Sequence, residues 1–374
     1  MFRITRLILL RLPALFRFFA KFRRNEKRLL VIKTDAIGDY ILFRNFLGVL
    51  KTSKTYKGYR IDLLGNVLWR DVSLKYDSPY VGQFMFIKAE ALYESPLQTL
   101  KTGWKLFKNN YEVVLQPTFS RTFITDGLAA LTAAKCIIGF ESDTERMPIK
   151  YKRKTDNFYT RLLPLPAGVY FEFDRSKCFI ESVTGEPIAL NSTSIGPDVT
   201  YKNGVIIFPG AGVVKREWKK ENLLALIKLL KQHSSQPIYL AGSNAEIPAG
   251  EYLEANLPPQ SIINQIGKSS LPELIEMIAN SSLVIANDTS AIHMAVATKT
   301  NSVCIVGGGH FERFVPYPEY FENRPVSAYY KMDCYYCNWN CIFKTADTEP
   351  YPCIANVDVN TVWDSVRPLL ITAG

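Results

Sequence analysis

The stretch SLVIANDTSAIHMA, residues 282–295, indicates the fold of this chain more directly than any other part. Its apolar residues at 283–286 predict a buried strand, and the polar cluster at 287–290 predicts a turn into a helix N-cap. Unpaired backbone N–H groups at such a helix start, together with the helix dipole, favour an anion such as a phosphate or diphosphate. The candidate side chains are Asp288, Thr289, Ser290 and His293. The alternative is an ordinary capped helix behind a core strand, with His293 packed inside.

Apolar runs of strand length alternate with amphipathic segments on both sides of this stretch, which is typical of parallel α/β sheets. The runs lie at 29–33, 61–65, 111–116 and 136–140 in the first half, and at 205–210, 237–243, 282–287 and 302–308 in the second. Residues 184–204 between the two sets are rich in turn formers. We expect an N-terminal domain at 29–185, a linker at 186–203, a C-terminal domain at 204–355 and a closing helix within 356–374. Two such doubly wound domains, facing a cleft, would hold a ligand at the carboxyl ends of their strands.

The positive charge of the chain is concentrated at its N-terminus. Residues 1–30 hold nine Lys and Arg against one Glu, so they carry +8 of the net charge of +10 and leave +2 for the other 344 residues. A nearly neutral globular body removes the main support for nucleic-acid binding.

Residues 1–28 predict a basic amphipathic helix, although Pro13 should break or kink it. On a helical wheel the cations at 3, 6, 17, 21 and 24 share one arc, and apolar residues at 4, 8, 12, 15, 16, 19 and 22 lie opposite. Arginines interrupt every run that could span a bilayer or serve as a signal peptide. We expect residues 1–24 to lie on an anionic membrane surface. The alternatives are a helix packed on the protein's own body and a disordered basic tail.

Two further strand-end loops carry chemistry-bearing residues. The first, KTDAIGDYILF at 33–43, offers Lys33, Thr34, Gly38 and Asp39. A carboxylate at a helix N-terminus is stabilised in its ionised form, so Asp39 is a candidate general base; the alternative is a simple helix N-cap.

The second loop is FPGAGVVKREW at 208–218, where Gly210 permits close approach of a ligand and Lys215 and Arg216 could neutralise a diphosphate. The alternative is a glycine turn with solvated cations. No GxGxxG follows any of the predicted strands, so dinucleotide redox chemistry has little support.

In the order and spacing of these three loops, the chain resembles glycosyltransferase family 9, the ADP-heptose:lipopolysaccharide heptosyltransferases and their relatives. The resemblance covers most of residues 29–320. It rests on Gly38-Asp39, on PGA followed by a basic residue two before Trp218, and most specifically on LPELIEMIANSSLVIANDTS at 271–290.

This resemblance implies a GT-B fold and an inverting, metal-independent transfer without a cofactor. It implies an acceptor site on the N-terminal domain, with Asp39 as the base that deprotonates the acceptor hydroxyl. The donor site lies on the C-terminal domain, and the resemblance places there Arg216, Asp288, Thr289 and His293. The position of the acidic residue that the family uses to hold the donor ribose is ambiguous here between Asn244 and Glu246. The chain departs from the family at Ser290, where glycine is usual, and at Arg44-Asn45.

Four of the seven cysteines, Cys334, Cys337, Cys341 and Cys353, gather in residues 334–353. Their density is compatible with zinc or an iron–sulfur cluster, although the spacing is not a standard zinc pattern. We expect no metal in the reaction and keep a structural metal as the alternative. The other cysteines look buried and unpaired, which favours a reducing compartment over a disulfide framework.

The sequence therefore predicts an enzyme of the cytoplasmic face of the cytoplasmic membrane, with a nucleotide-diphosphate sugar as donor, ADP-heptose by default, and a lipid-linked saccharide such as lipopolysaccharide core as acceptor. One alternative is a GT-B transferase that uses another donor for polysaccharide synthesis. The other is a catalytically idle protein that binds a nucleotide sugar or serves as a membrane scaffold.

Overall fold

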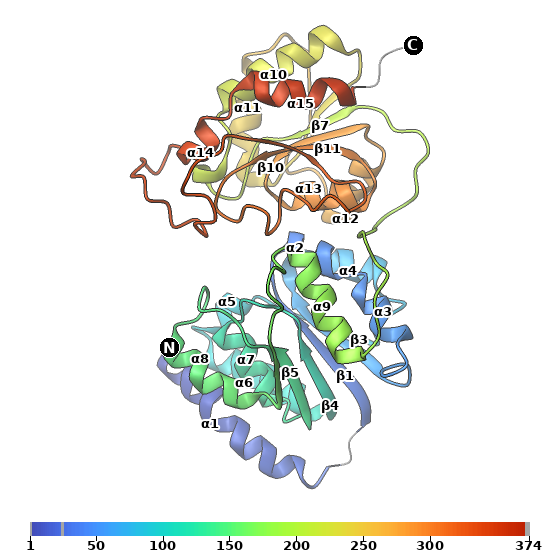
Figure 1. Cartoon of the computed structure of the whole chain (residues 1–374), viewed down its shortest axis with the longest axis vertical. Coiled ribbons are helices and arrows are strands. Elements are labelled where there is room, and N and C mark those ends of the chain that lie inside the picture. The colour runs from blue at the N-terminus through green and yellow to red at the C-terminus, as the bar shows by residue number, and fades with distance from the viewer. Residues whose placement is uncertain (1, 24–25, 371–374) are drawn as a thin grey trace. The chain divides into compact units, whose positions relative to one another are not determined.

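The chain forms two six-stranded, all-parallel sheets, each in its own compact unit of a computed structural model that describes residues 2–23 and 26–370 (Figure 1). Unit 1 comprises residues 1–169 and 173–189, and unit 2 comprises residues 170–172 and 190–374. In the part of the chain that the structure describes, no helix is long and apolar enough to cross a membrane.

The sheet of unit 1 has the strand order β3-β2-β1-β4-β5-β6. Its strands are β1 (Glu26–Lys33), β2 (Arg60–Asn66), β3 (Gln83–Ile87), β4 (Tyr111–Gln116), β5 (Cys136–Phe140) and β6 (Arg161–Leu163). Its helices are α1 (Phe2–Ala20), α2 (Ile37–Phe43), α3 (Phe46–Thr52), α4 (Arg70–Tyr76), α5 (Ala89–Leu92), α6 (Pro96–Lys108), α7 (Phe123–Leu131), α8 (Ile149–Thr155) and α9 (Glu172–Thr184). The strand order changes direction between β1 and β4, so a ligand-binding crevice is expected at the carboxyl ends of these two strands.

The sheet of unit 2 repeats this plan with the order β12-β11-β10-β7-β8-β9. Its strands are β7 (Val205–Phe208), β8 (Ile238–Leu240), β9 (Ile263–Asn264), β10 (Leu283–Asn287), β11 (Asn301–Val306) and β12 (Val326–Tyr329). Its helices are α10 (Lys220–His233), α11 (Ile247–Ala255), α12 (Leu271–Ala279), α13 (Ser290–Ala297), α14 (Pro352–Ala355) and α15 (Val359–Val366). The switch point lies between β7 and β10, which are the strands that precede the two predicted donor loops.

All eight predicted strands are present, and the four that the sequence missed are β3, β6, β9 and β12. These four are the edge strands of the two sheets. A strand inside a parallel sheet is buried on both faces and has a continuous apolar run, as the fully buried VIIF of β7 has. An edge strand such as β12 is partly exposed and lacks this signal.

Helix α1 packs against α6 and α7, and its buried stripe consists of Thr5, Leu9, Pro13 and Phe16 (Figure 1). The contact with α7 is close: a methyl group built on Gly127 would lie 2.7 Å from the Leu9 side chain. The helix continues through Pro13, so the prediction of a break there is wrong. Interior proline costs a helix about 3 kcal/mol, and the burial of Leu9 and Phe16 on either side offsets that cost.

Three cations of the N-terminal segment bind the protein's own body instead of lining one free basic face. Arg6 donates to the Tyr151 hydroxyl at 3.1 Å, and Arg17 donates to the Phe158 carbonyl at 3.0 Å. Arg23 donates to the Phe107 carbonyl at 2.7 Å. The packed-helix alternative thus holds for this side of α1. Arg24, which belongs to the predicted basic arc, lies outside the described residues.

Candidate functional site

The turn after β10 has the geometry that its sequence predicts. The strand ends at Asn287, Thr289 occupies the N-cap position, and α13 begins at Ser290. The Thr289 side chain makes no cap hydrogen bond, and within the described residues neither its hydroxyl nor that of Ser290 has a partner. Both hydroxyls are therefore free to bind an anion at the positive end of the α13 dipole.

Asn287 joins this turn to the glycine loop that follows β7. Its buried amide donates to the carbonyl of Gly210 at 3.1 Å, and its Oδ1 accepts from the backbone N–H of Trp218 at 2.9 Å. The Trp218 indole in turn donates to the carbonyl of Val357 at 2.7 Å. Two predicted donor segments, 77 residues apart at this contact, thus meet at one switch point.

Arg216 supplies a cation at the carboxyl ends of the strands of unit 2. It ends a 3₁₀ turn, Val214–Arg216, and its guanidinium lies 4.7 Å from the ring centre of Trp339. Partial burial lowers its pKa, while Asp288 acts in the opposite direction. Among the residues that the structure describes, Arg216 has no ion-pair partner. Lys215 differs, because its Nζ pairs with Asp347 at 3.0 Å.

The carboxyl group of Asp288 adjoins this cation. Burial raises its pKa to about 6, and the electrostatic effect of Arg216 opposes that rise. Asp288 is therefore mostly ionised at neutral pH, but it costs little to protonate. The pair places one cation and one weakly acidic carboxyl group at the start of α13.

His293 lies buried under the turn, 3 % exposed, with its Nδ1 2.6 Å from the Tyr317 hydroxyl. Burial lowers its pKa to about 4, so the imidazole is neutral at physiological pH. The ring packs and positions the first turn of α13, as the alternative interpretation of the sequence has it. Any effect of His293 on a donor passes through Tyr317 or through the backbone of α13.

Glu246 is the acidic residue that approaches the glycine loop. It accepts a hydrogen bond from the Ser243 hydroxyl at 2.7 Å. A methyl group built on Gly210 would lie 2.4 Å from its side chain, so glycine at 210 allows Glu246 to come this near. Asn244 lies elsewhere, against Gly267. Of the two candidates for a ribose contact, Glu246 is therefore the one beside the glycine loop.

In unit 1, a buried ion pair anchors the predicted acceptor loop at 33–43. Lys33 Nζ lies 2.8 Å from the Asp35 carboxylate, and the Thr118 hydroxyl donates to Asp35 at 2.6 Å. Burial tends to raise the pKa of Asp35, but Lys33 and the hydrogen bonds hold it below its usual value. Lys33 is fully buried. Its charge is therefore used inside unit 1 to anchor the loop, and its part in an acceptor site stays a prediction. The Thr34 carbonyl accepts from Asn66 at 2.9 Å.

Asp39 lies in the first turn of α2, partly exposed, one residue after the buried Gly38. The N-cap of α2 is Ala36, so the alternative role of Asp39 as an N-cap is wrong. The next residue, Tyr40, is buried, stacks on Trp69 at 3.7 Å and donates to Asp77 at 2.5 Å. These contacts fix the orientation of α2 and with it the position of Asp39.

Arg44, which departs from the family pattern, has a structural explanation. Its guanidinium makes a two-pronged contact with the buried Asp77 carboxylate, at 2.7 and 3.3 Å. Asp77 is the C-cap of α4, so this ion pair ties α2 to α4. The departure at 44 therefore belongs to the packing of unit 1.

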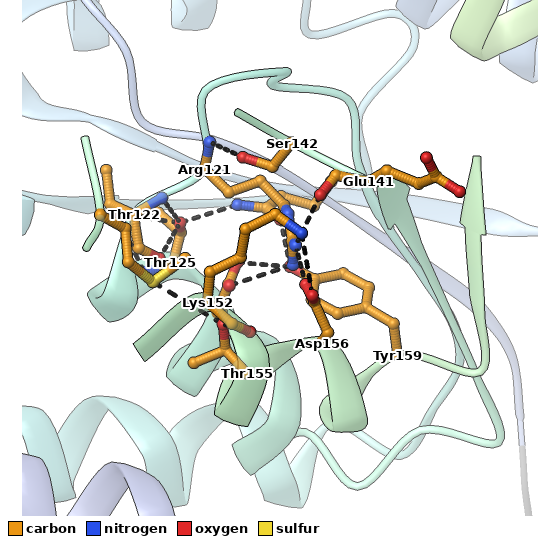
Figure 2. A network of polar contacts seen from close by, with 12 residues as sticks. Arg121, Thr122, Thr125, Glu141, Ser142, Lys152, Thr155, Asp156 and Tyr159 are labelled. Carbon is orange, nitrogen blue, oxygen red and sulfur yellow. Dashed lines mark hydrogen bonds and ion pairs between the residues drawn. The ribbon is translucent and has the colours of Figure 1, made fainter. Parts of the chain in front are cut away.

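A second buried network supports the loop between β4 and α7 (Figure 2). Arg121 is enclosed by protein, donates to Asp126 at 3.1 Å and contacts Asp156. Its guanidinium also lies 4.5 Å from the ring centre of Tyr159, whose hydroxyl donates to Asp126 at 2.6 Å. The loop that this network holds carries Thr118, the partner of Asp35. The network thus supports the predicted acceptor loop indirectly, because Thr118 connects the two loops.

Part of this chain matches a known protein family and a curated relative. The family model described as glycosyltransferase family 9 (heptosyltransferase) matches residues 182–335. The match covers about two fifths of the chain and includes both predicted donor loops. The chain is 31% identical over 104 residues to lipooligosaccharide heptosyltransferase 2 of Haemophilus influenzae, a match that spans 26% of this chain and 30% of that protein.

Solved structures that resemble the chain cover both of its units. The ADP-heptose lipopolysaccharide heptosyltransferase II of E. coli gives a TM-score of 0.68 at 14% identity over 91% of this chain and 98% of the other. A family 9 glycosyltransferase of Veillonella parvula gives 0.67 at 15% identity over 92% and 97%. The E. coli heptosyltransferase WaaC with ADP gives 0.66 at 14% identity over 92% and 100%. These likenesses show the GT-B fold.

The residues that match the family model include both donor loops of unit 2, at 208–218 and 287–293, whereas Asp39 lies outside them. Sequence reasoning assigned no role to three residues that shape the site. Asp35 is adjacent to residues that the sequence singled out, so its carboxylate was a detectable signal. Thr118 and Trp339 were not detectable, because only tertiary contacts bring them to Asp35 and Arg216.

Proposed function

We propose that the chain is an inverting glycosyltransferase that moves a sugar from a nucleotide-diphosphate sugar to a saccharide acceptor of the lipopolysaccharide-core type. The observation that carries this proposal is the set of polar groups at the carboxyl edge of the unit 2 sheet, within the residues that match the family 9 model. There the unpaired Arg216 and the free hydroxyls of Thr289 and Ser290 gather at the start of α13. ADP-heptose is the first donor to test, because the similar E. coli protein WaaC has been solved with ADP.

The donor half of the reaction requires neutralisation of the leaving diphosphate. We assign this task to Arg216, to the backbone N–H groups at the start of α13, and to the hydroxyls of Thr289 and Ser290. Fixed dipoles of this kind need no reorganisation as charge develops on the leaving group. Lys215 adds positive charge nearby, and Glu246 is placed to accept hydrogen bonds from the ribose. Protein groups, rather than a metal ion, thus stabilise the leaving group in this proposal.

The acceptor half requires a base. We assign it to Asp39, which would remove the proton from the acceptor hydroxyl as that oxygen attacks the anomeric carbon of the donor. The new glycosidic bond forms as the bond to the diphosphate oxygen breaks, and the electron pair leaves with the diphosphate. One displacement of this kind inverts the anomeric configuration.

Replacing Arg216 by methionine is expected to weaken ADP binding by about 10- to 150-fold, since a hydrogen bond to a charged group contributes about 1.5–3 kcal/mol. Lys215→Met is the matched control, because Lys215 already has a carboxylate partner in Asp347; its effect should be several-fold smaller. Isothermal titration calorimetry with ADP measures both affinities. Equal affinities of the Arg216→Met variant and the wild type would contradict the assignment.

Transfer itself is tested with a panel of nucleotide sugars and lipopolysaccharide-core acceptors, with product detected by mass spectrometry. The proposal expects one donor to be used. NMR of the product should show that the anomeric configuration of the transferred sugar is inverted relative to the donor. A protein that binds none of the donors would refute the enzyme proposal and favour a role outside catalysis.

We also propose that the solvent-facing side of α1 rests on the anionic inner face of the cytoplasmic membrane. The residues on this side include large exposed apolar side chains with cations among them: Ile4, Leu7, Leu15, Phe18, Phe19 and Phe22, with Arg3, Arg11 and Lys21. The neighbouring helix α6 extends the surface with Leu97 and Trp104, and Trp104 contacts Phe16 of α1. An acceptor anchored in the same leaflet would then be concentrated near the enzyme.

Deleting α1 would not test this proposal, because Leu9 and Phe16 belong to the core of unit 1. The double variant Phe18→Ser/Phe22→Ser changes only exposed rings, and it should bind vesicles containing phosphatidylglycerol about 30-fold more weakly, from a loss of about 2 kcal/mol of apolar burial. Leu74→Ser, an exposed position on α4, is the control. Co-sedimentation of the double variant at the wild-type level would contradict the membrane proposal.

A further inference from the structure

Four cysteines of unit 2 line a single small cavity. These are Cys334, Cys337, Cys341 and Cys353. The cavity has a volume of about 10 Å³, which is the space of about one water molecule. Three of the four come from one loop, and the fourth, Cys353, lies in the short helix α14 that follows it. Cys136, Cys178 and Cys304 lie outside this set, and all seven cysteines are free thiols.

We propose that these four cysteines bind one thiophilic metal ion, zinc or iron. Four thiolates are the ligand set that selects these metals in a tetrahedral site. The space among the side chains suits one ion better than a multi-iron cluster. The other lining residues, which include Met332, Trp339 and Phe343, contribute no carboxylate or imidazole that could compete for the ion.

The loop that carries the cysteines has no regular secondary structure, although the N–H groups of Tyr336 and Asn338 donate to the carbonyls of Gly308 and Gly309 at 2.7 and 2.9 Å. Residues 330–351 contain neither helix nor strand, and loops of such length without secondary structure are uncommon unless they are functional. Tyr336, Asn338 and Trp339 adopt left-handed backbone conformations, with φ of 69°, 49° and 62°. Left-handed conformations of non-glycine residues cost of order 1–3 kcal/mol each, and coordination by the flanking cysteines would offset this cost.

Metal binding needs a rearrangement of the side chains. Among residues 2–23 and 26–370, no three potential ligands already stand in ligating positions. The thiols nevertheless share one cavity, so rotation of cysteine side chains about their Cα–Cβ bonds is the movement that would bring the sulfurs to an ion.

The same cavity adjoins the donor cations, so the ion would act on the site of the proposed transferase. Trp339, on whose ring Arg216 lies, and Tyr351, whose N–H donates to the Lys215 carbonyl at 2.8 Å, both line it. An ion that fixes residues 334–353 would therefore hold the aromatic support of Arg216 in place. This part of the inference rests on the proposed function, whereas the metal site itself does not.

Metal content is the primary test. The full-length protein, purified without a histidine tag under reducing conditions, should contain about one zinc or iron ion per chain by mass spectrometry of the metals. Cys341→Ser and Cys353→Ser should lose the ion, and Cys178→Ser, in α9 of unit 1, should keep it. Wild-type protein with no zinc or iron above background, even after incubation with either ion and removal of the excess, would overturn the proposal. So would equal loss of metal from Cys178→Ser.

A spectroscopic test does not depend on how well the serine variants fold. Wild-type protein stripped with a chelator and loaded with cobalt(II) should develop the intense visible bands of tetrahedral cobalt thiolate, and added zinc should remove them. A weak, octahedral cobalt spectrum would overturn the four-thiolate site. The stripped protein should also bind ADP more weakly and regain affinity with zinc or iron. Because metal content and cobalt spectra need no transfer, a failed metal site and a failed transferase proposal give separate results.

Discussion

Replacing Asp39 by alanine is expected to lower kcat for sugar transfer by about 10²- to 10⁴-fold, the usual contribution of a positioned general base. The affinity for ADP should stay within twofold, because the proposed donor contacts lie in unit 2 and Asp39 lies in unit 1. Steady-state transfer assays and calorimetry with ADP measure the two quantities. A loss of kcat without a loss of affinity is the pattern of a group that acts on the reacting atoms.

Two variants separate this effect from damage to the fold. Asp39→Asn keeps the size of the side chain and removes the base, so it should be as inactive as Asp39→Ala. Asp71→Ala removes an exposed acid from the first turn of α4 in the same unit and should keep wild-type activity. Full activity of Asp39→Ala would show that another group removes the proton.

Replacing Arg121 by methionine is expected to lower the free energy of unfolding of unit 1 by about 3–5 kcal/mol. The reason is that the fully buried Asp126 would lose its counter-charge. Burial already raises the pKa of Asp126, and removal of the guanidinium would raise it further. The folded state would then hold a proton that the unfolded chain gives up, so the loss of stability should be smaller in mildly acidic buffer than at neutral pH.

Denaturant unfolding followed by tryptophan fluorescence measures this loss. The double variant Arg121→Met/Asp126→Asn should recover part of it, because neutral partners avoid a buried unpaired charge. Glu26→Gln, which removes an exposed partner 4.0 Å from Arg28, should change stability by less than about 1 kcal/mol. If Arg121→Met were no more destabilising than Glu26→Gln, the network would be unimportant for folding.

The interior strands of both sheets could be predicted because a strand that is buried on both faces has a continuous apolar run in its own sequence. The eight strands that are flanked on both sides have apolar runs, and their ends coincide with the loops that bear Asp39, Gly210 and Asp288. Edge strands such as β9, with two residues of intermediate or exposed burial, leave no such mark. Position in the sheet, which the local sequence does not encode, therefore decided which strands were missed.

The N-terminal helix shows a different limit. Of the apolar arc that the helical wheel predicted, only Phe16 is buried, whereas Ile4, Leu15, Phe19 and Phe22 are exposed. Packing against α7 buries Leu9 instead. The same applies to its cations, because the partner of Arg6 is Tyr151, far along the chain. Amphipathicity predicted the helix, but it could not predict which face is buried.

The sequence by itself determined the parallel α/β class, the succession of strands and loops, and the order of the three polar loops, because strand burial and helix capping depend on neighbouring residues. Only the tertiary structure decided how individual side chains are used. It buried Lys33 against Asp35, paired Lys215 with Asp347 and left Arg216 unpaired on Trp339. Whether a charge is available to a ligand depends on partners that can lie more than a hundred residues away, and folding alone brings them together.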